Sequence, residues 1–148
     1  MRLVIQRVAR AEVRVEGETI GRIGRGLVLL VAIERSDSPD DLDWVSNKVL
    51  QMRVFEDSSG KMNLSATDVG AEILVVSQFT LAADLDRGRR PSFDDAAPPG
   101  RAQELLESLV DRIAGSGLRI ATGRFGAFMQ VDLVNDGPVT FILERPRR

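Results

Sequence analysis

Hydrophobic and polar residues alternate near the start of the chain with the two-residue period of half-buried strands. The alternation is clearest at residues 12–16 and 19–23, with Gly17 marking the turn between them. Residues 1–7 predict a further short strand. Residues 27–33 are apolar throughout, which is typical of a strand covered on both faces, so we expect this segment at the centre of the sheet.

Two segments carry the spacing and the boundary residues of helices. The first has Ser38 as its N-cap, Pro39 at the first helical position and Asp41 where a capping box has its acid. The second follows Pro98 and stops at residues 115–117, which contain two glycines. Apolar residues at helical spacing should pack both helices on the sheet: Leu42, Val45, Val49 and Met52 in the first, and Leu105, Leu106, Leu109, Val110 and Ile113 in the second.

The remaining predicted elements are short. Residues 57–60 predict a turn, after which an apolar strand ends at Ser77. The polar stretch 84–100 is interpreted as an ordered functional loop, because neither flank is large enough to be a separate domain. The last strands are expected at residues 118–122, 129–134 and 139–143. Together these elements predict a single α+β domain over residues 1–148, with a mostly antiparallel sheet and two main helices.

Composition is that of a globular protein and excludes several kinds of active site. Hydrophobic residues make up 43% and charged residues 28%, and no apolar stretch is long enough to cross a bilayer. The first residues lack the long apolar region of a signal peptide, so we expect a cytoplasmic protein without a membrane partner. The absence of cysteine and histidine excludes thiol nucleophiles, Ser-His-Asp triads and zinc sites built on these residues.

Four aspartates gather at the start of the first predicted helix: Asp37, Asp40, Asp41 and Asp43. They lack the spacing and the glycine of a calcium-binding EF-hand. Carboxylates at a helix N-terminus are stabilised by the helix dipole, which explains them without a ligand. The aspartates thus indicate no calcium site, and the function considered below is expected to need no metal and no organic cofactor.

Arginine strongly outnumbers lysine among the 20 basic residues, of which only Lys48 and Lys61 are lysines. The net charge is −2, so attraction to a polyanion would have to come from local patches. Solvation of the surface explains single arginines, whereas a patch could contact RNA phosphates. The two dense patches are Arg87, Arg89 and Arg90 in the polar loop, and Arg145, Arg147 and Arg148 at the tail.

The most informative motifs are residues 77–81 (SQFTL) and residues 135–140 (NDGPVT). The first closes a buried apolar run, and the second places Gly137 and Pro138 between two strand-like segments. Both resemble the D-aminoacyl-tRNA deacylases, enzymes that remove D-amino acids from wrongly charged tRNA. The resemblance spans nearly the whole chain, because further matching motifs follow in order at residues 6–8, 60–64, 88–93 and 122–126.

The resemblance implies a barrel-like sheet and a homodimer with both active sites at the interface. Taken alone, Gly137–Pro138 would predict a simple hairpin turn, since a proline peptide bond is trans by default. The resemblance instead implies a cis bond, whose carbonyl groups face the neighbouring subunit's pocket and exclude an L side chain. Arg7 matches the arginine that fixes this geometry, although by itself it would be a surface strand residue. Glycine has no side chain to exclude, so we expect glycyl-tRNA to be cleaved too.

Residues 77–81 supply the catalytic candidates: Ser77, Gln78, Phe79 and Thr80. On a strand, Ser77 and Phe79 would face one way, and Gln78 and Thr80 the other. A strand end here would expose the N–H groups of Phe79 and Thr80 as an oxyanion hole. Thr80 could attack the ester, but a threonine nucleophile needs a base that the chain hardly supplies. We favour an activated water, helped by the 2′-hydroxyl of the terminal adenosine, with Thr80 positioning it; an ordinary strand residue is the structural alternative.

Three further residues match positions that line the substrate pocket in the family: Phe125, Met129 and Ala102. Without the resemblance, Phe125 and Met129 would be assigned to the core. The chain departs from the family pattern at Leu85, Phe128 and Asp132.

The leading hypothesis is an esterase that acts on D-aminoacyl-tRNA, with little discrimination among D-amino acids. One alternative is a non-enzymatic nucleic-acid-binding module that uses residues 87–90. That class generally has a basic surplus and exposed aromatic residues, whereas aromatic residues make up only 5% here. The other alternative is a dimeric hydrolase of small D-amino-acid esters with no RNA role.

Overall fold

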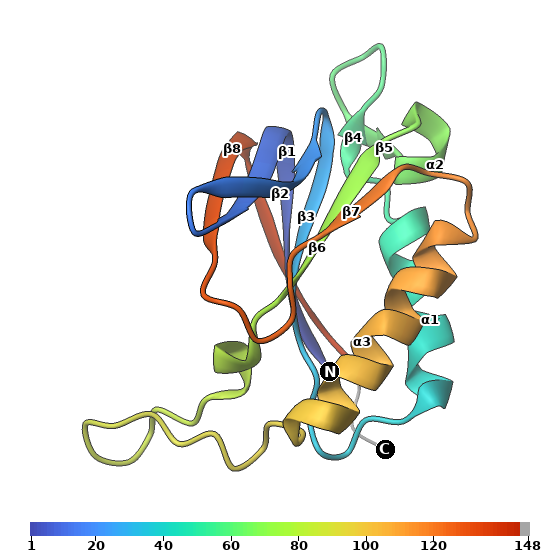
Figure 1. The fold of residues 1–148 in the computed structure, drawn as a ribbon. Coiled ribbons are helices and arrows are strands. Elements are labelled where there is room, and N and C mark those ends of the chain that lie inside the picture. The colour runs from blue at the N-terminus through green and yellow to red at the C-terminus, as the bar shows by residue number, and fades with distance from the viewer. Residues whose placement is uncertain (146–148) are drawn as a thin grey trace.

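The computed structural model describes residues 1–145, and its main sheet curls into a nearly closed barrel (Figure 1). Arg147 and Arg148 of the tail patch lie outside the described residues. The strands follow the order β2 (Glu18–Ile23), β1 (Arg2–Val15), β3 (Gly26–Ala32), β6 (Glu72–Ser77) and β7 (Ile120–Thr122). A long last strand, β8 (Gln130–Glu144), also pairs with β1 over most of its length.

The sheet is mixed, with both antiparallel and parallel pairs. β1 pairs antiparallel with β2, β3 and β8, whereas β3 and β7 both run parallel to β6. Parallel neighbours need a crossover connection, which α1 (Pro39–Gln51) supplies between β3 and β6, and α3 (Pro99–Ala114) between β6 and β7. The predicted α+β class is confirmed, while the parallel pairs were not foreseen.

The central strands are buried on both faces, as the continuous apolar run predicted. Alternate residues of β3 point into two different hydrophobic clusters: Leu27 and Leu29 contact the cluster under the helices, and Val28 the cluster inside the barrel. β6 does the same with Val75 and Leu74. The two helices therefore cover one side of the sheet while the curled strands enclose the other (Figure 1).

The helices begin where the sequence predicts. The N–H group of Ser38 donates to the Asp41 carboxylate at 2.9 Å, and Pro39 is the first residue of α1. The predicted apolar faces are buried on the sheet, although Met52 lies just beyond the end of α1. The smaller elements are β4 (Phe55–Glu56), β5 (Met62–Leu64), α2 (Ala66–Val69) and the 3₁₀ turn η1 (Phe79–Ala82). No helix in the described part of the chain is long and apolar enough to span a bilayer.

β8 differs from the prediction of two strands joined by a Gly-Pro turn. Asn135 lies opposite Val8 and Thr140 lies opposite Gln6, so residues 136–139 stand opposite the single residue Arg7. Both halves of β8 pair with the same strand, β1, in the same direction. The Gly-Pro pair is therefore part of a large bulge in one strand, not of a hairpin turn.

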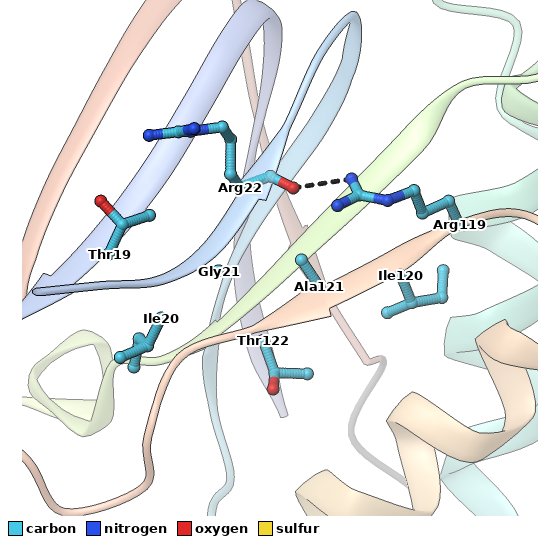
Figure 2. A pocket seen from close by; sticks show the side chains of 8 residues that line it. All are labelled: Thr19, Ile20, Gly21, Arg22, Arg119, Ile120, Ala121 and Thr122. Carbon is cyan, nitrogen blue, oxygen red and sulfur yellow. Dashed lines mark hydrogen bonds between the residues drawn. The ribbon is translucent and has the colours of Figure 1, made fainter.

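The two outer strands β2 and β7 meet at a seam that leaves a hollow of about 510 Å³ (Figure 2). A Cβ on Gly21 would lie 2.6 Å from the carbonyl oxygen of Thr122, so only glycine fits this approach. Arg119 reaches across the seam and donates to the carbonyl oxygen of Arg22 at 2.6 Å (Figure 2). It also donates to the Glu72 carboxylate at 2.8 Å. The hollow thus lies where the barrel closes, and the hydrogen bonds of Arg119 join the two sides of the seam.

Glu72 is the charged anchor of this seam. One of its oxygens accepts the N–H group of Gly24 at 2.9 Å, and the other accepts Arg119. The hydrogen bond from Gly24 and then the contact with Arg119 lower the pKa of Glu72 from its ordinary value. A lowered carboxyl pKa stabilises the folded state above that ordinary value, and the contribution is lost as pH falls through the folded-state pKa.

We therefore expect Glu72→Gln to lower the free energy of unfolding by about 1 kcal/mol at neutral pH. The difference from the unmodified chain should shrink as pH falls through the lowered pKa, because protonated Glu72 resembles glutamine. Urea unfolding at a series of pH values measures this difference. Glu104→Gln, on an exposed part of α3, is the control and should change little. A Glu72→Gln deficit that persists undiminished in acid would contradict this assignment.

Candidate active site

An apolar cavity of about 410 Å³ lies where β3 and β6 end. Val31 and Ile33 line it from the end of β3, Ser77 is the last residue of β6, and Pro99 and Ala102 belong to the first turn of α3. Because β3 and β6 are parallel, their carboxyl ends meet at one edge, where α/β sheets commonly bind ligands. The volume is in the range of small-molecule sites.

Aromatic rings border this cavity. Phe79 and Phe93 pack edge to face, with ring centroids 5.1 Å apart, and remain 56% and 38% exposed. Phe125 and Gly126 complete the wall from the segment between β7 and β8. The other lining residues are Arg35, Ala96, Ala97 and Pro98.

Among the described residues that line the cavity, Arg35 is the one with an ionisable side chain. Its Nε donates to the carbonyl oxygen of Asp94, and its main-chain N–H group donates to that of Asp95 at 2.9 Å. Among the described residues, no group of three acidic, histidine or cysteine side chains is placed to hold a metal ion. The cavity therefore offers apolar walls and backbone groups, and no side chain suited to be a general base.

The strand that leads to the predicted catalytic residues ends at Ser77, and η1 begins at Phe79. The expected alternation of side chains beyond Ser77 is therefore wrong, because a 3₁₀ turn replaces the strand. The expected strand end is confirmed. Within residues 1–145 the N–H groups of Phe79 and Thr80 donate no hydrogen bond, as is usual for the first N–H groups of a helical turn.

Gln78 and Thr80 interact directly on the exposed side of this turn. The side-chain amide of Gln78 donates to the hydroxyl oxygen of Thr80. An amide N–H group cannot accept a proton, so Gln78 cannot act as the base for a Thr80 nucleophile. The contact leaves the Thr80 hydroxyl proton available to a bound molecule.

The Gly137–Pro138 peptide bond is cis, as the resemblance implied. Gly137 has φ +135°, and a Cβ there would lie 2.7 Å from the side chain of Val139. Both Gly137 and Pro138 are exposed. Asn135 ties the bulge together, because its side chain accepts the N–H group of Val139 at 3.1 Å and donates to Thr140 at 2.9 Å.

Arg7 supports the bulge from beneath. It is 7% exposed, so its interpretation as a surface strand residue is wrong. Its Nε donates to the carbonyl oxygen of Asp136 at 3.1 Å, and its Nη1 donates to that of Val54 at 2.8 Å. Arg7 thus joins the bulge to the chain that leads into β4.

The bulge and the cavity lie in different parts of one chain. Arg7 stands opposite Leu27, whereas Ser77 stands opposite Val31, four residues further along β3. This offset corresponds to roughly 13 Å along the strand direction, and the three strand spacings from β8 to β6 add roughly 14 Å across the sheet. Gly137 and Pro138 are accordingly absent from the lining of the cavity.

The structure brings together four of the predicted site residues in the cavity: Ser77, Phe79, Ala102 and Phe125. Met129 is not among the lining residues and packs next to Gly123 against the inner cluster of the barrel. Arg35 and Phe93 were missed as site residues. Phe93 lies in a recognised motif, whereas the position of Arg35 depends on parallel pairing that the sequence pattern did not indicate.

A family model described as D-Tyr-tRNA(Tyr) deacylase matches residues 4–144. The chain belongs to this family. Curated relatives named D-aminoacyl-tRNA deacylase cover it almost completely. The protein of Geotalea uraniireducens (strain Rf4) is 52% identical, over 99% of this chain and 95% of its own. That of Desulfitobacterium hafniense (strain Y51) is 54% identical, over 97% of each chain.

Solved structures also resemble this deacylase-family chain. One, named c-Myc DNA Unwinding Element Binding Protein, is 44% identical with a TM-score of 0.93, over 99% of this chain and 100% of its own. Another, titled as a probable eukaryotic D-amino acid tRNA deacylase, has a TM-score of 0.83 over 96% of this chain. At 17% identity, that second likeness concerns the fold alone. The predicted family and the predicted enzyme class, a hydrolase of the deacylase type, are confirmed.

Proposed function

We propose that the chain hydrolyses the ester bond of D-aminoacyl-tRNA and of glycyl-tRNA, releasing the free amino acid and tRNA, in the cytoplasm. Family membership supports the ester and the tRNA substrate. The structural observation that carries the proposal is the pair of N–H groups at Phe79 and Thr80, beside an apolar cavity, for which residues 1–145 supply no acceptor. Such a pair can stabilise the oxyanion that forms when an ester is hydrolysed.

The N–H groups of Phe79 and Thr80 would stabilise the oxyanion of the reaction. Water attacks the ester carbonyl carbon, and negative charge develops on the carbonyl oxygen. The bond to the ribose 3′-oxygen then breaks, and the proton from water passes to that oxygen by way of the neighbouring 2′-hydroxyl. One donor of this kind contributes roughly 2.7–4 kcal/mol to the transition state.

The substrate itself supplies the hydroxyl that relays the proton in this proposal, because no carboxylate, histidine or lysine lines the cavity in the part of the chain that the structure describes. The Thr80 hydroxyl, which accepts a hydrogen bond from Gln78, would orient the water or the ester through its own proton. Thr80 is therefore a positioning residue in this mechanism and not a nucleophile.

The terminal adenosine fits the aromatic side of the cavity. Phe79 and Phe93 line the cavity and are partly exposed, and a base can stack on such rings whatever its sequence context. Ala102 is small and leaves room beside Phe125, so both expected pocket residues serve as walls of this subsite. Met129 would act indirectly, by supporting the segment that carries Phe125.

The carbonyl groups of Gly137 and Pro138 would exclude L-amino acids from the site. Arg7 and Asn135 hold the bulge at both ends, which gives it the rigidity that a steric filter needs. Because it lies roughly 13 Å along the sheet from the cavity, it would act on the cavity of a second copy. The chain is then a homodimer with two shared sites.

The surface of β8 supports this homodimer. Among the described residues β8 pairs only with β1, so its outer edge remains an unpaired strand edge. Large apolar side chains are exposed along it and beside it: Phe128, Val131, Val134, Phe141 and Ile142. Phe128, which departs from the family pattern, is 88% exposed. A second copy packed on this surface would cover both the edge and the apolar residues.

A non-enzymatic nucleic-acid-binding module is the second candidate. One observation favours it: a solved structure 44% identical to this chain is named for binding a DNA element. The net charge of −2 disfavours it. The third hypothesis, a hydrolase of small D-amino-acid esters, is separated from the others by the substrates compared below.

We expect D-tyrosyl-tRNA and glycyl-tRNA to be deacylated and L-tyrosyl-tRNA to remain intact, because the filter excludes only an L side chain. Release of radiolabelled amino acid from the three tRNAs measures this. D-Tyrosine ethyl ester is the matched free ester and should react far more slowly. Cleavage of no ester would support the binding module, and equal cleavage of the free and tRNA-linked esters would support the small-ester hydrolase. Glycyl-tRNA left intact would count against the steric filter.

Thr80→Ala should keep more than about a tenth of the wild-type rate, because a positioning group contributes less than a nucleophile. Single-turnover deacylation of D-tyrosyl-tRNA gives this rate. Thr80→Ser is the control that retains the hydroxyl and should be close to wild type. A near-complete loss in Thr80→Ala, with normal folding by circular dichroism, would restore Thr80 as the nucleophile.

Shared sites predict which substrates a mixed dimer of two variants cleaves. Ala102→Trp should block the cavity and abolish cleavage. Gly137→Val should displace the bulge, because φ is +135° there, so its homodimer should cleave L-tyrosyl-tRNA as well as D-tyrosyl-tRNA. A heterodimer of the two, isolated with two different tags, has one open cavity, which faces the intact bulge of the other chain. It should cleave D-tyrosyl-tRNA at about half of the wild-type rate and leave L-tyrosyl-tRNA intact, as two shared sites related by two-fold symmetry require. A heterodimer that cleaves L-tyrosyl-tRNA would indicate that each site belongs to a single chain.

A further inference from the structure

The segment between η1 and α3 contains a hairpin that extends away from the body of the protein (Figure 1). Asp84 and Ser92 form its base, with reciprocal main-chain hydrogen bonds of 2.8 and 3.0 Å. Gly88 has φ +66° near its tip. We call residues 84–92 the arginine hairpin. Its paired base makes it an ordered projection and not a loose connection.

The arginine hairpin carries cations that the fold does not use. Arg87, Arg89 and Arg90 are exposed, and none forms an ion pair or hydrogen bond within the described part of the chain. By contrast, Arg112 and Arg119 bind carboxylates at 2.7 and 2.8 Å. Three exposed guanidinium groups on one projection can each donate to a phosphate without giving up a contact that stabilises the fold.

Negative charge lies mostly at the base of the hairpin and beyond it. Asp86 is the one acid between Asp84 and Ser92, so the tip keeps a positive surplus. The Asp84 carboxylate accepts the main-chain N–H group of Asp86 at 2.8 Å. Asp94 and Asp95 follow the hairpin, and their carbonyl oxygens bind Arg35. Most of the acidic residues thus lie at the base of the hairpin or after it, whereas the arginines lie at its projecting end.

The support of the hairpin is also the wall of the cavity. Phe93 follows Ser92 directly, lines the cavity and contacts Phe79. The next residues are fixed to the end of β3, since Ala96 bridges Glu34 and Ala97 donates to the carbonyl oxygen of Ile33 at 3.0 Å. A polymer whose last residue occupied the cavity would therefore leave it close to the base of the hairpin.

We propose that the arginine hairpin binds the backbone phosphates of the RNA strand whose terminal nucleoside occupies the cavity. This inference rests on the proposed function. From its base to its tip the hairpin has about four residues, roughly 13 Å of extended chain. That length equals the rise of about four stacked nucleotides. The contacts fall on nucleotides that precede the ester, so they hold the substrate and take no part in its cleavage.

Phosphate contacts with the arginine hairpin should strengthen the binding of tRNA but not of a substrate that lacks phosphates. Arg89→Gln/Arg90→Gln should lower kcat/KM for D-tyrosyl-tRNA roughly tenfold near physiological salt, mainly through KM. The same variant should cleave D-tyrosyl-adenosine, which has no phosphate, at the wild-type rate. The slope of log kcat/KM against log salt should become shallower by about 1.4–1.8, since each phosphate contact contributes roughly 0.7–0.9.

The control removes two cations from the helical side of the molecule. Lys48→Gln/Arg112→Gln changes the net charge equally, from residues on α1 and α3, and should leave both substrates and the salt slope nearly unchanged. Binding of uncharged tRNA, followed by fluorescence anisotropy, tests the hairpin separately from catalysis. A wild-type chain that binds tRNA through the hairpin but cleaves no ester would refute the proposed function and not this contact.

Three results would overturn the inference. Equal losses on the tRNA and the adenosine ester would mean that the hairpin shapes the cavity. Equal losses in the two double variants would mean that only overall charge matters. Dissociation of Arg89→Gln/Arg90→Gln into single chains, measured by sedimentation, would assign the hairpin to contact between two copies.

Discussion

Parallel pairing of β3 with β6 is the constraint on which the rest of the structure depends. It aligns the carboxyl ends of two largely buried strands, and the cavity, η1 and the first turn of α3 gather at that edge. The same register places Leu27 and its neighbour Arg7 at the opposite end. The cavity and the bulge in β8 therefore lie at opposite ends of the sheet. The proposed homodimer would bring these two surfaces together from different chains.

The proposed mechanism relies mainly on N–H and carbonyl groups of the main chain. A chain without histidine or cysteine has few side chains that can exchange protons near neutral pH. In the proposed mechanism, N–H groups beside the cavity would stabilise the oxyanion, and carbonyl groups of the bulge would exclude L side chains. Backbone groups are positioned by secondary structure and by the side chains that hold it, here Arg7 and Asn135. Exchanging the surrounding side chains can therefore alter the site indirectly, by moving the backbone.

Local signals predicted much of the fold. Ser38, Pro39 and Asp41 marked the start of α1, and the apolar run at residues 27–33 marked the central strand, because these features depend only on neighbours in sequence. The parallel pairs were missed because register between distant strands has no local signature. For the same reason, the Gly-Pro pair looked like a hairpin turn. Its place in a bulge depends on β1 holding both halves of β8.

The candidate site was predicted in part, and mainly through recognised motifs. Ser77, Phe79, Ala102 and Phe125 meet in the cavity, while Arg35 carried no sequence signal because it contributes through contacts with Asp94 and Asp95. The burial of Arg7 also had no sequence signal. Its partners are the main-chain carbonyl oxygens of Val54 and Asp136, and any residue could supply such an oxygen.

The bulge in β8 also lies outside the hydrogen-bonded pairing that joins the rest of this strand to β1. Residues 136–139 lie outside the ladder, and the strand resumes its pairing with β1 on both sides of them. An insertion or deletion within this loop would leave every other partner of β8 opposite the same residue as before. A change in chain length at this position would therefore alter the proposed filter without disturbing the barrel that carries it.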